Sequence, residues 1–386
     1  MTDHRLDAPI LPGGTIGMMG GGQLGRMFAL EARRMGYRVV VLDPGSDTPA
    51  AQFCDHHIRA PFEDVNACLE LARRSDVVTL EWENADVATL RAMREHVRIH
   101  PSPDVLEVAQ HRVREKDAAR RLGVLTAEYR AVRTREDLDA ALREIGAPAI
   151  LKTARMGYDG KGQAVIREAA DADTAWAALS GADDFILEAM VPFRMEVSVV
   201  CARSASGEIS TFPVAENEHR RGILHLSVVP ARVEPAIADE AARVARTLAE
   251  GLGVIGLVAV EMFVTADGRI LMNEIAPRPH NSGHYTWEAC PVSQFEQQLR
   301  AVCGLPLGDA RLLRPAAMVN LMGEDSGTGL GRPGAANALA IPGTALHLYG
   351  KAEARPGRKM GHLTTLADTA DEAARAAVDA WERMTR

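Results

Sequence analysis

Two glutamates on either side of a predicted hairpin form the first candidate site. Glu261 and Glu274 flank Asp267-Gly268, a dipeptide that favours a two-residue turn between β-strands. With that loop, Glu261 faces Glu274 with Cβ atoms about 5 Å apart, where like charges destabilise a sheet. Mg²⁺ between them would reverse that cost and leave coordination positions for phosphate. The pattern predicts a metal–nucleotide site. Two solvated glutamates are the alternative, and a longer loop would break the register.

A glycine-rich loop after a predicted strand forms the second candidate site. Lys152 closes the apolar strand 149–153, and the loop from Gly157 to Gln163 follows it. The N–H groups of such a loop can approach phosphate oxygens, and Lys161 adds positive charge. No Gly-Lys-Ser/Thr follows, so this is not a P-loop. A surface turn is the alternative, although a lysine at the end of a buried strand needs an anionic partner.

Polar residues follow the Glu274 strand at once. Prolines fix the backbone on both sides of Arg278, and His280 and Asn281 come next. This dense set of donors is suited to stabilising developing negative charge. Upstream, the segment 186–192 is apolar apart from Glu188 and would suit an adenine. A nearby carboxylate, Glu196, would suit ribose hydroxyls.

The N-terminal region has a β-α-β pattern. A strand at 15–19 leads into Gly20–Gly25, which matches G-x-G-x-x-G, and a second strand at 38–42 ends in Asp43. The glycines allow close approach of phosphate, and Asp43 lies where a ribose-binding acid would lie in an NAD-binding fold. A later strand, 77–80, is followed by Glu83, which could serve a ligand or cap the next helix.

The composition predicts a soluble, reduced, multidomain protein. A chain of 386 residues is long enough for two or three domains. A formal net charge of −8 argues against nucleic acid or an anionic membrane as the main partner. No apolar run is long enough for a membrane span. Five cysteines without a C-x-x-C pair favour the cytoplasm and disfavour a cysteine zinc site.

The elements that must position these residues are long helices and short strands. We expect helices at 104–122, 240–252 and 369–384, and a domain break at the Pro101–Pro103 segment. Pro306 and Pro315 mark a second shift in composition.

Taken together, in this order and spacing, the motifs resemble the ATP-grasp superfamily and, within it, the N5-carboxyaminoimidazole ribonucleotide synthases of purine biosynthesis. The most specific segments are 20–26, 157–163, 215–230 and 273–284. Two positions depart from common patterns. Ala276 stands where many ATP-grasp enzymes have Asn, which we interpret as a subfamily mark. Trp82 stands where Phe is expected, beside Glu83.

The resemblance implies an α/β and α+β architecture with an ATP-grasp fold. A Rossmann-like domain would span 1–103, an ATP-grasp domain with a lid near 124–187 would span 104–308, and a small β-rich domain would span 309–386. The resemblance also implies ligand-binding residues of four kinds. ATP would be bound by Arg112, Lys152, Gly157, Tyr158, Asp159, Gly160, Lys161, Gly162, Gln163, Glu188, Ala189, Met190, Val191, Glu196, His219, Asn273 and Glu274. The ribonucleotide would contact Gln23, Leu24, Glu83, Asp159, Lys351 and Arg358. Arg278, His280 and Asn281 would surround the bicarbonate-derived carboxyl group, and Glu261 with Glu274 would hold Mg²⁺.

The implied reaction is the ATP- and bicarbonate-dependent carboxylation of aminoimidazole ribonucleotide through carboxyphosphate. A homodimer and coupling to the mutase that uses the product are implied as well. Three alternatives stay open. They are a formate-dependent glycinamide ribonucleotide transformylase of the same architecture, an NAD-dependent oxidoreductase, and a catalytically inactive nucleotide-binding regulator.

Overall fold

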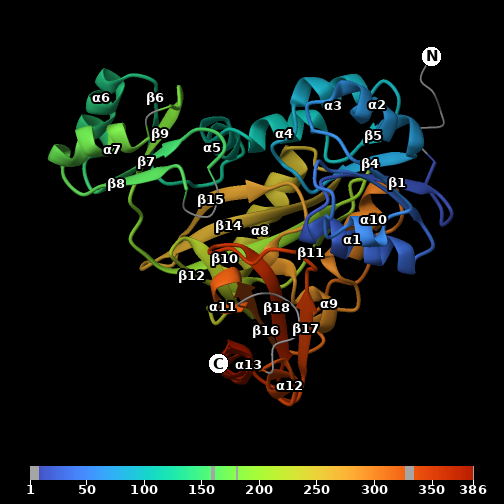
Figure 1. Ribbon diagram of the computed structural model, residues 1–386. Coiled ribbons are helices and arrows are strands. Elements are labelled where there is room, and N and C mark those ends of the chain that lie inside the picture. The colour runs from blue at the N-terminus through green and yellow to red at the C-terminus, as the bar shows by residue number, and fades with distance from the viewer. Residues whose placement is uncertain (1–7, 158–160, 180, 327–333, 386) are drawn as a thin grey trace.

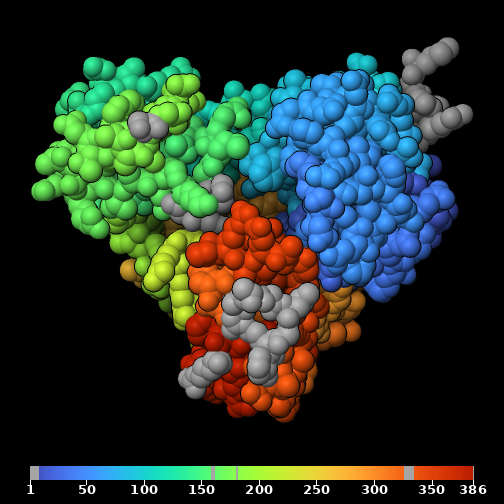
Figure 2. Space-filling view, in the orientation of Figure 1, coloured from blue at the N-terminus to red at the C-terminus, as the bar shows by residue number. Residues whose placement is uncertain are grey.

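The computed structural model describes residues 8–157, 161–179, 181–326 and 334–385. Three β-sheets organise these residues. Figure 1 shows the N-terminal region in blue, a green lobe, and a yellow-to-red body that continues to the C-terminus. In Figure 2 the blue, green and orange-red parts meet around a central hollow.

The N-terminal region is a parallel five-stranded sheet, as the β-α-β pattern predicts. Its strand order is β3-β2-β1-β4-β5. The three central strands, β1, β2 and β4, are mostly buried and apolar, as expected for a parallel sheet that is covered on both faces. The five strands are β1 (Thr15–Met19), β2 (Arg38–Leu42), β3 (His56–Ile58), β4 (Val77–Leu80) and β5 (Arg98–Ile99), with helices α1 (Gln23–Arg34), α2 (Val65–Arg74) and α3 (Val87–Met93).

The helix expected at 104–122 is two helices. α4 (Pro103–Ala109) and α5 (Arg112–Arg121) are separated because His111 has an extended backbone. The break places Arg112 in the first turn of α5, where its backbone N–H donates to Ala154 O at 2.9 Å.

The green lobe is an antiparallel four-stranded sheet of order β6-β9-β7-β8. Its apolar core includes Leu138, Leu151 and Phe185. The elements are β6 (Tyr129–Val132), α6 (Arg135–Ile145), β7 (Ala149–Thr153), β8 (Gln163–Ile166), α7 (Ala172–Ala178) and β9 (Phe185–Ala189). The lobe runs from Tyr129 to Ala189, which is close to the bounds predicted for the lid, 124–187. The predicted strand 149–153 is confirmed as β7.

The largest sheet has nine strands and joins the middle of the chain to its C-terminal part. Its order is β15-β14-β10-β12-β13-β16-β18-β17, with β11 paired to β10. Helices α8 (Pro235–Gly251), α10 (Gln294–Val302) and α13 (Ala370–Thr385) pack on it. The strands are β10 (Phe193–Arg203), β11 (Ile209–Thr211), β12 (Ala215–Arg220), β13 (Ile223–Val229), β14 (Gly256–Thr265), β15 (Ile270–Ala276), β16 (Ala316–Met322), β17 (Thr344–Leu348) and β18 (Lys359–Leu366). The shorter helices are α9 (Thr286–Ala289), α11 (Gly323–Ser326) and α12 (Gly334–Leu339), and the 3₁₀ turns are η2 (Ala51–Phe53), η3 (Ala169–Asp171) and η4 (Asn281–Gly283).

The hairpin between β14 and β15 differs from the prediction in its loop and agrees with it in its result. Thr265 N donates to Arg269 O at 3.0 Å, so the loop has three residues, with Gly268 at φ 81°. The predicted two-residue loop is therefore wrong. A β-bulge at Asn273 adds one residue to β15, and Glu261 still pairs with Glu274. The extra loop residue shifts the pairing register by one residue, and the bulge shifts it back, so the two effects cancel at Glu261 and Glu274.

Candidate active site

The carboxylate pair is electrostatically asymmetric. Burial, and then the charge of Glu274, raise the pKa of Glu261 to about 7. Burial would also raise the pKa of Glu274, but Arg112, Lys152 and Lys116 outweigh it and lower that pKa. Arg112 is the close partner, since its Nη1 donates to Glu274 Oε2 at 3.0 Å. The ionised form is therefore disfavoured at Glu261 and favoured at Glu274.

Arg112 also links the carboxylate pair to the glycine-rich loop. Its Nη2 donates to Gly157 O at 3.2 Å. At the other end of the loop Gly162 has φ 69°, and Gln163 pairs with Lys152 across β7 and β8. The predictions for Tyr158, Asp159 and Gly160 lie outside the described residues. The predicted loop and metal pair thus share one arginine.

Behind the loop, Glu188 lies between two buried lysines. Its Oε2 accepts from Lys152 Nζ at 2.9 Å, and its Oε1 lies 3.4 Å from Lys116 Nζ. Burial would raise the pKa of Glu188, yet the two lysines lower it to about 2. The pKa of Lys152 is lowered too, because burial, together with Lys116 and Arg112, outweighs Glu188. The cluster therefore has positive charge to spare for an anion, as expected for phosphate binding.

Helix α5 supplies two residues that the sequence analysis missed. Lys116 also donates to Asn273 O at 3.0 Å, and Glu115 accepts from Ile275 N at 2.6 Å. Burial raises the pKa of Glu115 to about 8. Both contacts hold the bulged strand that carries Glu274. In the sequence, the only indication of their role was that a charged pair, Glu115-Lys116, lies within a predicted helix. Such a pair is also typical of a solvent-exposed helix face.

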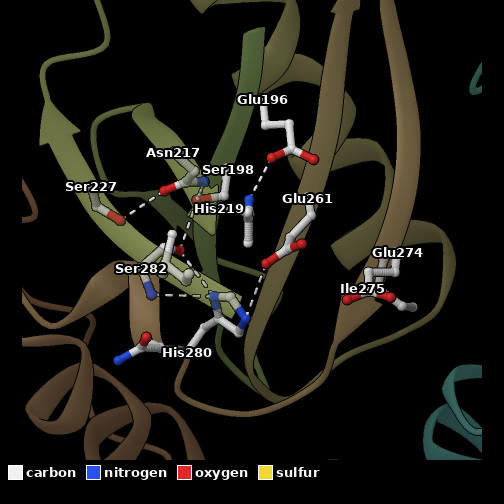
Figure 3. A network of polar contacts seen from close by, with 12 residues as sticks. Glu196, Ser198, Asn217, His219, Ser227, Glu261, Glu274, Ile275, His280 and Ser282 are labelled. Atoms are coloured by element: carbon white, nitrogen blue, oxygen red, sulfur yellow. Dashed lines mark hydrogen bonds and ion pairs between the residues drawn. The ribbon is translucent and has the colours of Figure 1, made fainter. Parts of the chain in front are cut away.

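Two histidines flank Glu261 (Figure 3). His280 Nε2 lies 3.2 Å from Glu261 Oε1, and His219 Nδ1 bonds Glu196. Burial alone would lower the pKa of His219, but the bond to Glu196 and the charge of Glu261 raise it. Burial lowers the pKa of His280 well below its usual value. The structure thus brings together His219, Glu196, His280 and Glu261, all of which the sequence singled out.

Arg278 connects the first domain to the sheet. Its Nη2 and Nε each bond a different carboxylate oxygen of Glu83, at 2.9 and 2.8 Å. Two parallel bonds of this kind orient a guanidinium firmly. Asn281, by contrast, exchanges both side-chain amide contacts with Asn320 and is buried. Its contact with a carboxyl group stays a prediction.

The glycine turn of the first domain is occupied by the protein's own carboxylates. Gly21 N donates to Asp43 Oδ2 at 2.8 Å, and Gly22 N and Gly25 N donate to Glu81. Burial, partly offset by those two N–H groups, raises the pKa of Glu81 to about 6. These amides therefore bind internal carboxylates rather than a dinucleotide phosphate. This arrangement disfavours the NAD alternative.

The remaining predicted residues lie on or next to the first domain, the green lobe and the C-terminal strands. Gln23 begins α1, and Leu24 is buried in the core of the first domain. Lys351 Nζ donates to Lys359 O at 2.7 Å and lies close enough to Glu81 to lower its pKa. Arg358 donates to Glu353 O at 2.9 Å. Three residues predicted to bind ATP, Ala189, Met190 and Val191, already use part of their backbone within the protein. Ala189 N and Met190 N donate to Glu128 O and Pro148 O, and Val191 O accepts from Phe193 N.

The carboxylate pair fits a hard cation that brings other oxygens with it. Asn273 Oδ1, next to Glu274, is buried without a hydrogen-bond partner. Within the described part of the chain, no group of three His, Cys, Asp or Glu side chains is arranged to hold a metal. Mg²⁺ commonly binds through one or two carboxylates plus phosphates and water, so two glutamates suffice.

Comparison with known families gives matches along nearly the whole chain. A ribonucleotide synthetase preATP-grasp domain matches residues 14–110, an ATP-grasp domain matches 117–295, and a phosphoribosylaminoimidazole carboxylase C-terminal domain matches 316–376. The N5-carboxyaminoimidazole ribonucleotide synthase of Bacillus subtilis is 48% identical over 363 residues, covering 94% of each chain. The chain belongs to the N5-carboxyaminoimidazole ribonucleotide synthase family. The predicted family, ATP-grasp fold and ligase class are thereby confirmed.

Solved structures of the synthase family agree with this assignment. An ADP complex of an N5-carboxyaminoimidazole ribonucleotide synthetase is 47% identical, with a TM-score of 0.92, and the alignment covers 98% of this chain and 100% of that one. The Aspergillus clavatus synthase with ADP and 5-aminoimidazole ribonucleotide is 33% identical, with a TM-score of 0.89, covering 97% and 100%. The transformylase and oxidoreductase alternatives are not favoured by these matches.

Proposed function

We propose that this chain carboxylates 5-aminoimidazole ribonucleotide on its exocyclic amine, using ATP and bicarbonate and releasing ADP and phosphate. The observation that carries the proposal is the pairing of Glu261 with Glu274 beside Arg112, Lys152 and the glycine-rich loop. ATP would lie between the green lobe and the large sheet, with its phosphates toward these groups. Glu188 to Val191 would contact the adenine, and Glu196 with His219 the ribose.

Mg²⁺ would be held by Glu261 and Glu274, where it would neutralise phosphate charge and position the terminal phosphoryl group. The protein's own contribution is orientation and electrostatics. Bicarbonate would attack the terminal phosphorus and form carboxyphosphate, and the amine would then capture the carboxyl group. Arg278, already oriented by Glu83, would stabilise the anionic carboxyl group, with His280 and Asn281 near it.

The ribonucleotide would lie between the first domain and the C-terminal strands. Gln23 and Leu24 at the start of α1, Glu83, and the cations Lys351 and Arg358 would border this space. Asp159 would reach it from the glycine-rich loop. Because Glu83 bonds Arg278, substrate binding and the carboxylation site would be coupled through that ion pair. Closure of the 124–187 segment would exclude water from the reactive acyl phosphate.

We also propose the domain boundaries 1–103, 104–308 and 309–386, a cytoplasmic location, a homodimer, and transfer of the labile product to the mutase. Among the described residues, no helix has the length and apolarity that a bilayer span needs. Light scattering of the purified chain tests the dimer.

The test of the function is ADP release with ATP and Mg²⁺, with and without aminoimidazole ribonucleotide, in bicarbonate-depleted and bicarbonate-supplemented buffer. Release that needs the ribonucleotide, with product formation that needs bicarbonate, supports the proposal. Release with formate and glycinamide ribonucleotide instead would replace it with the transformylase. Glu261→Gln serves as the matched inactive control, and near-normal turnover in that variant would refute the metal assignment.

A further inference from the structure

A continuous chain of hydrogen bonds crosses the large sheet and ends on Glu261 (Figure 3). Ser227 Oγ donates to Asn217 Oδ1 at 2.7 Å, and Asn217 Nδ2 donates to Ser198 Oγ at 2.9 Å. Ser198 Oγ then donates to Ser282 Oγ at 2.7 Å. These four residues come from β13, β12, β10 and the turn η4, so the chain spans separate elements. All four are buried.

The last part of the chain reaches the ring of His280. Ser282 Oγ lies 2.9 Å from His280 Nδ1, and the backbone N of Ser282 lies 3.3 Å from the same atom. A backbone N–H can only donate, so Nδ1 must accept. Ser282 Oγ accepts from Ser198, so its own proton is available to donate to the same Nδ1, which the backbone N–H already requires to be an acceptor. The ring proton therefore resides on Nε2, which faces Glu261 Oε1 at 3.2 Å.

The sheet register explains why this chain exists. Ser198 pairs directly with Glu261 across β10 and β14, and Asn217 pairs with Ser227 across β12 and β13. Directly paired residues share one face of a sheet. The polar row thus runs along the same face as the carboxylate pair. Folding alone does not require polar side chains in this row, because apolar side chains could fill the same buried positions and would leave no donor or acceptor unpaired.

We propose that Ser282 and Ser198, supported by Asn217 and Ser227, are positioning residues that fix His280 as the Nε2–H tautomer and thereby orient Glu261 for Mg²⁺. The proposal rests on the proposed function, because it takes Glu261 as a metal ligand. Partners that fix a histidine tautomer or a ligating carboxylate from outside the ligand set tune metal affinity. Here they would act through His280 rather than touch the metal or a substrate.

The test combines a spectroscopic measurement on the metal-free full chain with a metal titration. Nitrogen NMR of the histidine-labelled protein reports which ring nitrogen carries the proton, and a His280→Gln spectrum assigns the signal. We expect the Nε2–H tautomer in the wild type and a measurable Nδ1–H fraction in Ser282→Ala, because the shorter of the two contacts to Nδ1, that of the hydroxyl at 2.9 Å, is lost while the backbone N–H at 3.3 Å remains. We also expect Ser282→Ala to raise the Mg²⁺ concentration for half-maximal ADP release about tenfold, at the low end of the effect of losing a partner outside the ligand set. Ser198→Ala should have the same effects to a smaller extent.

Ser204→Ala is the matched control, because Ser204 is also a buried serine but bonds Ser206 and Glu208 in a distant turn. It should leave both readouts unchanged. An Nδ1–H tautomer in the wild type would overturn the proposal, and so would a tautomer that Ser282→Ala does not alter. These results do not depend on the metal. Failure of the proposed function would instead appear as normal Mg²⁺-dependent ADP release by Glu261→Gln.

Discussion

Replacing Glu261 by glutamine should make the metal-free protein more stable while it abolishes catalysis. Burial and the charge of Glu274 raise the pKa of Glu261 from 4.5 to about 7. A carboxyl group with a raised pKa binds its proton more tightly in the folded chain, so stability falls as the pH rises from 4.5 to 7. At 1.36 kcal/mol per pH unit, the ionised side chain costs the metal-free fold roughly 3 kcal/mol above pH 7.

The assay is thermal unfolding of wild type and Glu261→Gln without metal at pH 8 and at pH 4.5. The variant should unfold at a higher temperature at pH 8 and close to wild type at pH 4.5, where both side chains are neutral. Mg²⁺ with ATP should stabilise the wild type more than the variant, because a ligand of the folded state adds to stability. ADP release should be lost in the variant at every pH.

Glu274→Gln is the control variant, and its effect on stability at pH 8 should have the opposite sign to that of Glu261→Gln. Although burial would raise the pKa of Glu274, Arg112 lowers it, so the ionised carboxylate stabilises the fold. Its removal leaves the Arg112 guanidinium without that partner and should destabilise the protein at pH 8. A Glu261→Gln protein that is no more stable than wild type at pH 8 would refute the electrostatic reasoning.

Two further predictions concern buried charge. Lys116→Met removes one of the cations that lower the pKa of Glu188 to about 2, so it should cost about 3 kcal/mol of stability at neutral pH and weaken ATP binding. That loss should shrink as the pH falls from 4.5 towards 2, and Lys116→Arg should restore part of it in unfolding and ATP-titration experiments. Burial also lowers the pKa of His284 and His362 well below 6.5. Protons then bind the unfolded chain first, so stability should fall as the pH falls below 6.5. His362→Gln should flatten this fall in unfolding temperature between pH 7 and pH 5, and an unchanged slope would contradict the assignment. The exposed His56, replaced by Gln, is the control.

Local patterns were sufficient to predict the parts of the site that lie close together in the sequence. The turn residues Asp267-Gly268 and the two glutamates predicted the carboxylate pair, although the loop length was wrong. The bulge at Asn273 could not be predicted, because it depends on Lys116 and Glu115 contacting β15 from a distant helix. The pairing was right because two shifts of one residue cancelled.

Contacts between distant segments were the part that the sequence could not reveal. The G-x-G-x-x-G motif predicted the strand–turn–helix correctly. Its occupant, however, depends on Glu81, which reaches the turn from the end of another strand. The Arg278–Glu83 pair and the Asn281–Asn320 exchange likewise join residues far apart in the chain. Such contacts follow from the packing of the sheets, and no local spacing encodes them.

The continuity of the large sheet limits how the C-terminal part can be handled in the laboratory. β13 pairs with β16 from Leu226 to Val229, across the proposed boundary at 308. Truncating the chain there would leave β13 as an apolar edge strand with unpaired N–H and C=O groups, which is a template for aggregation. A shortened chain ending at 308 should therefore be insoluble, even though a family boundary lies nearby, and domain exchange between relatives should place its junction before β10 instead.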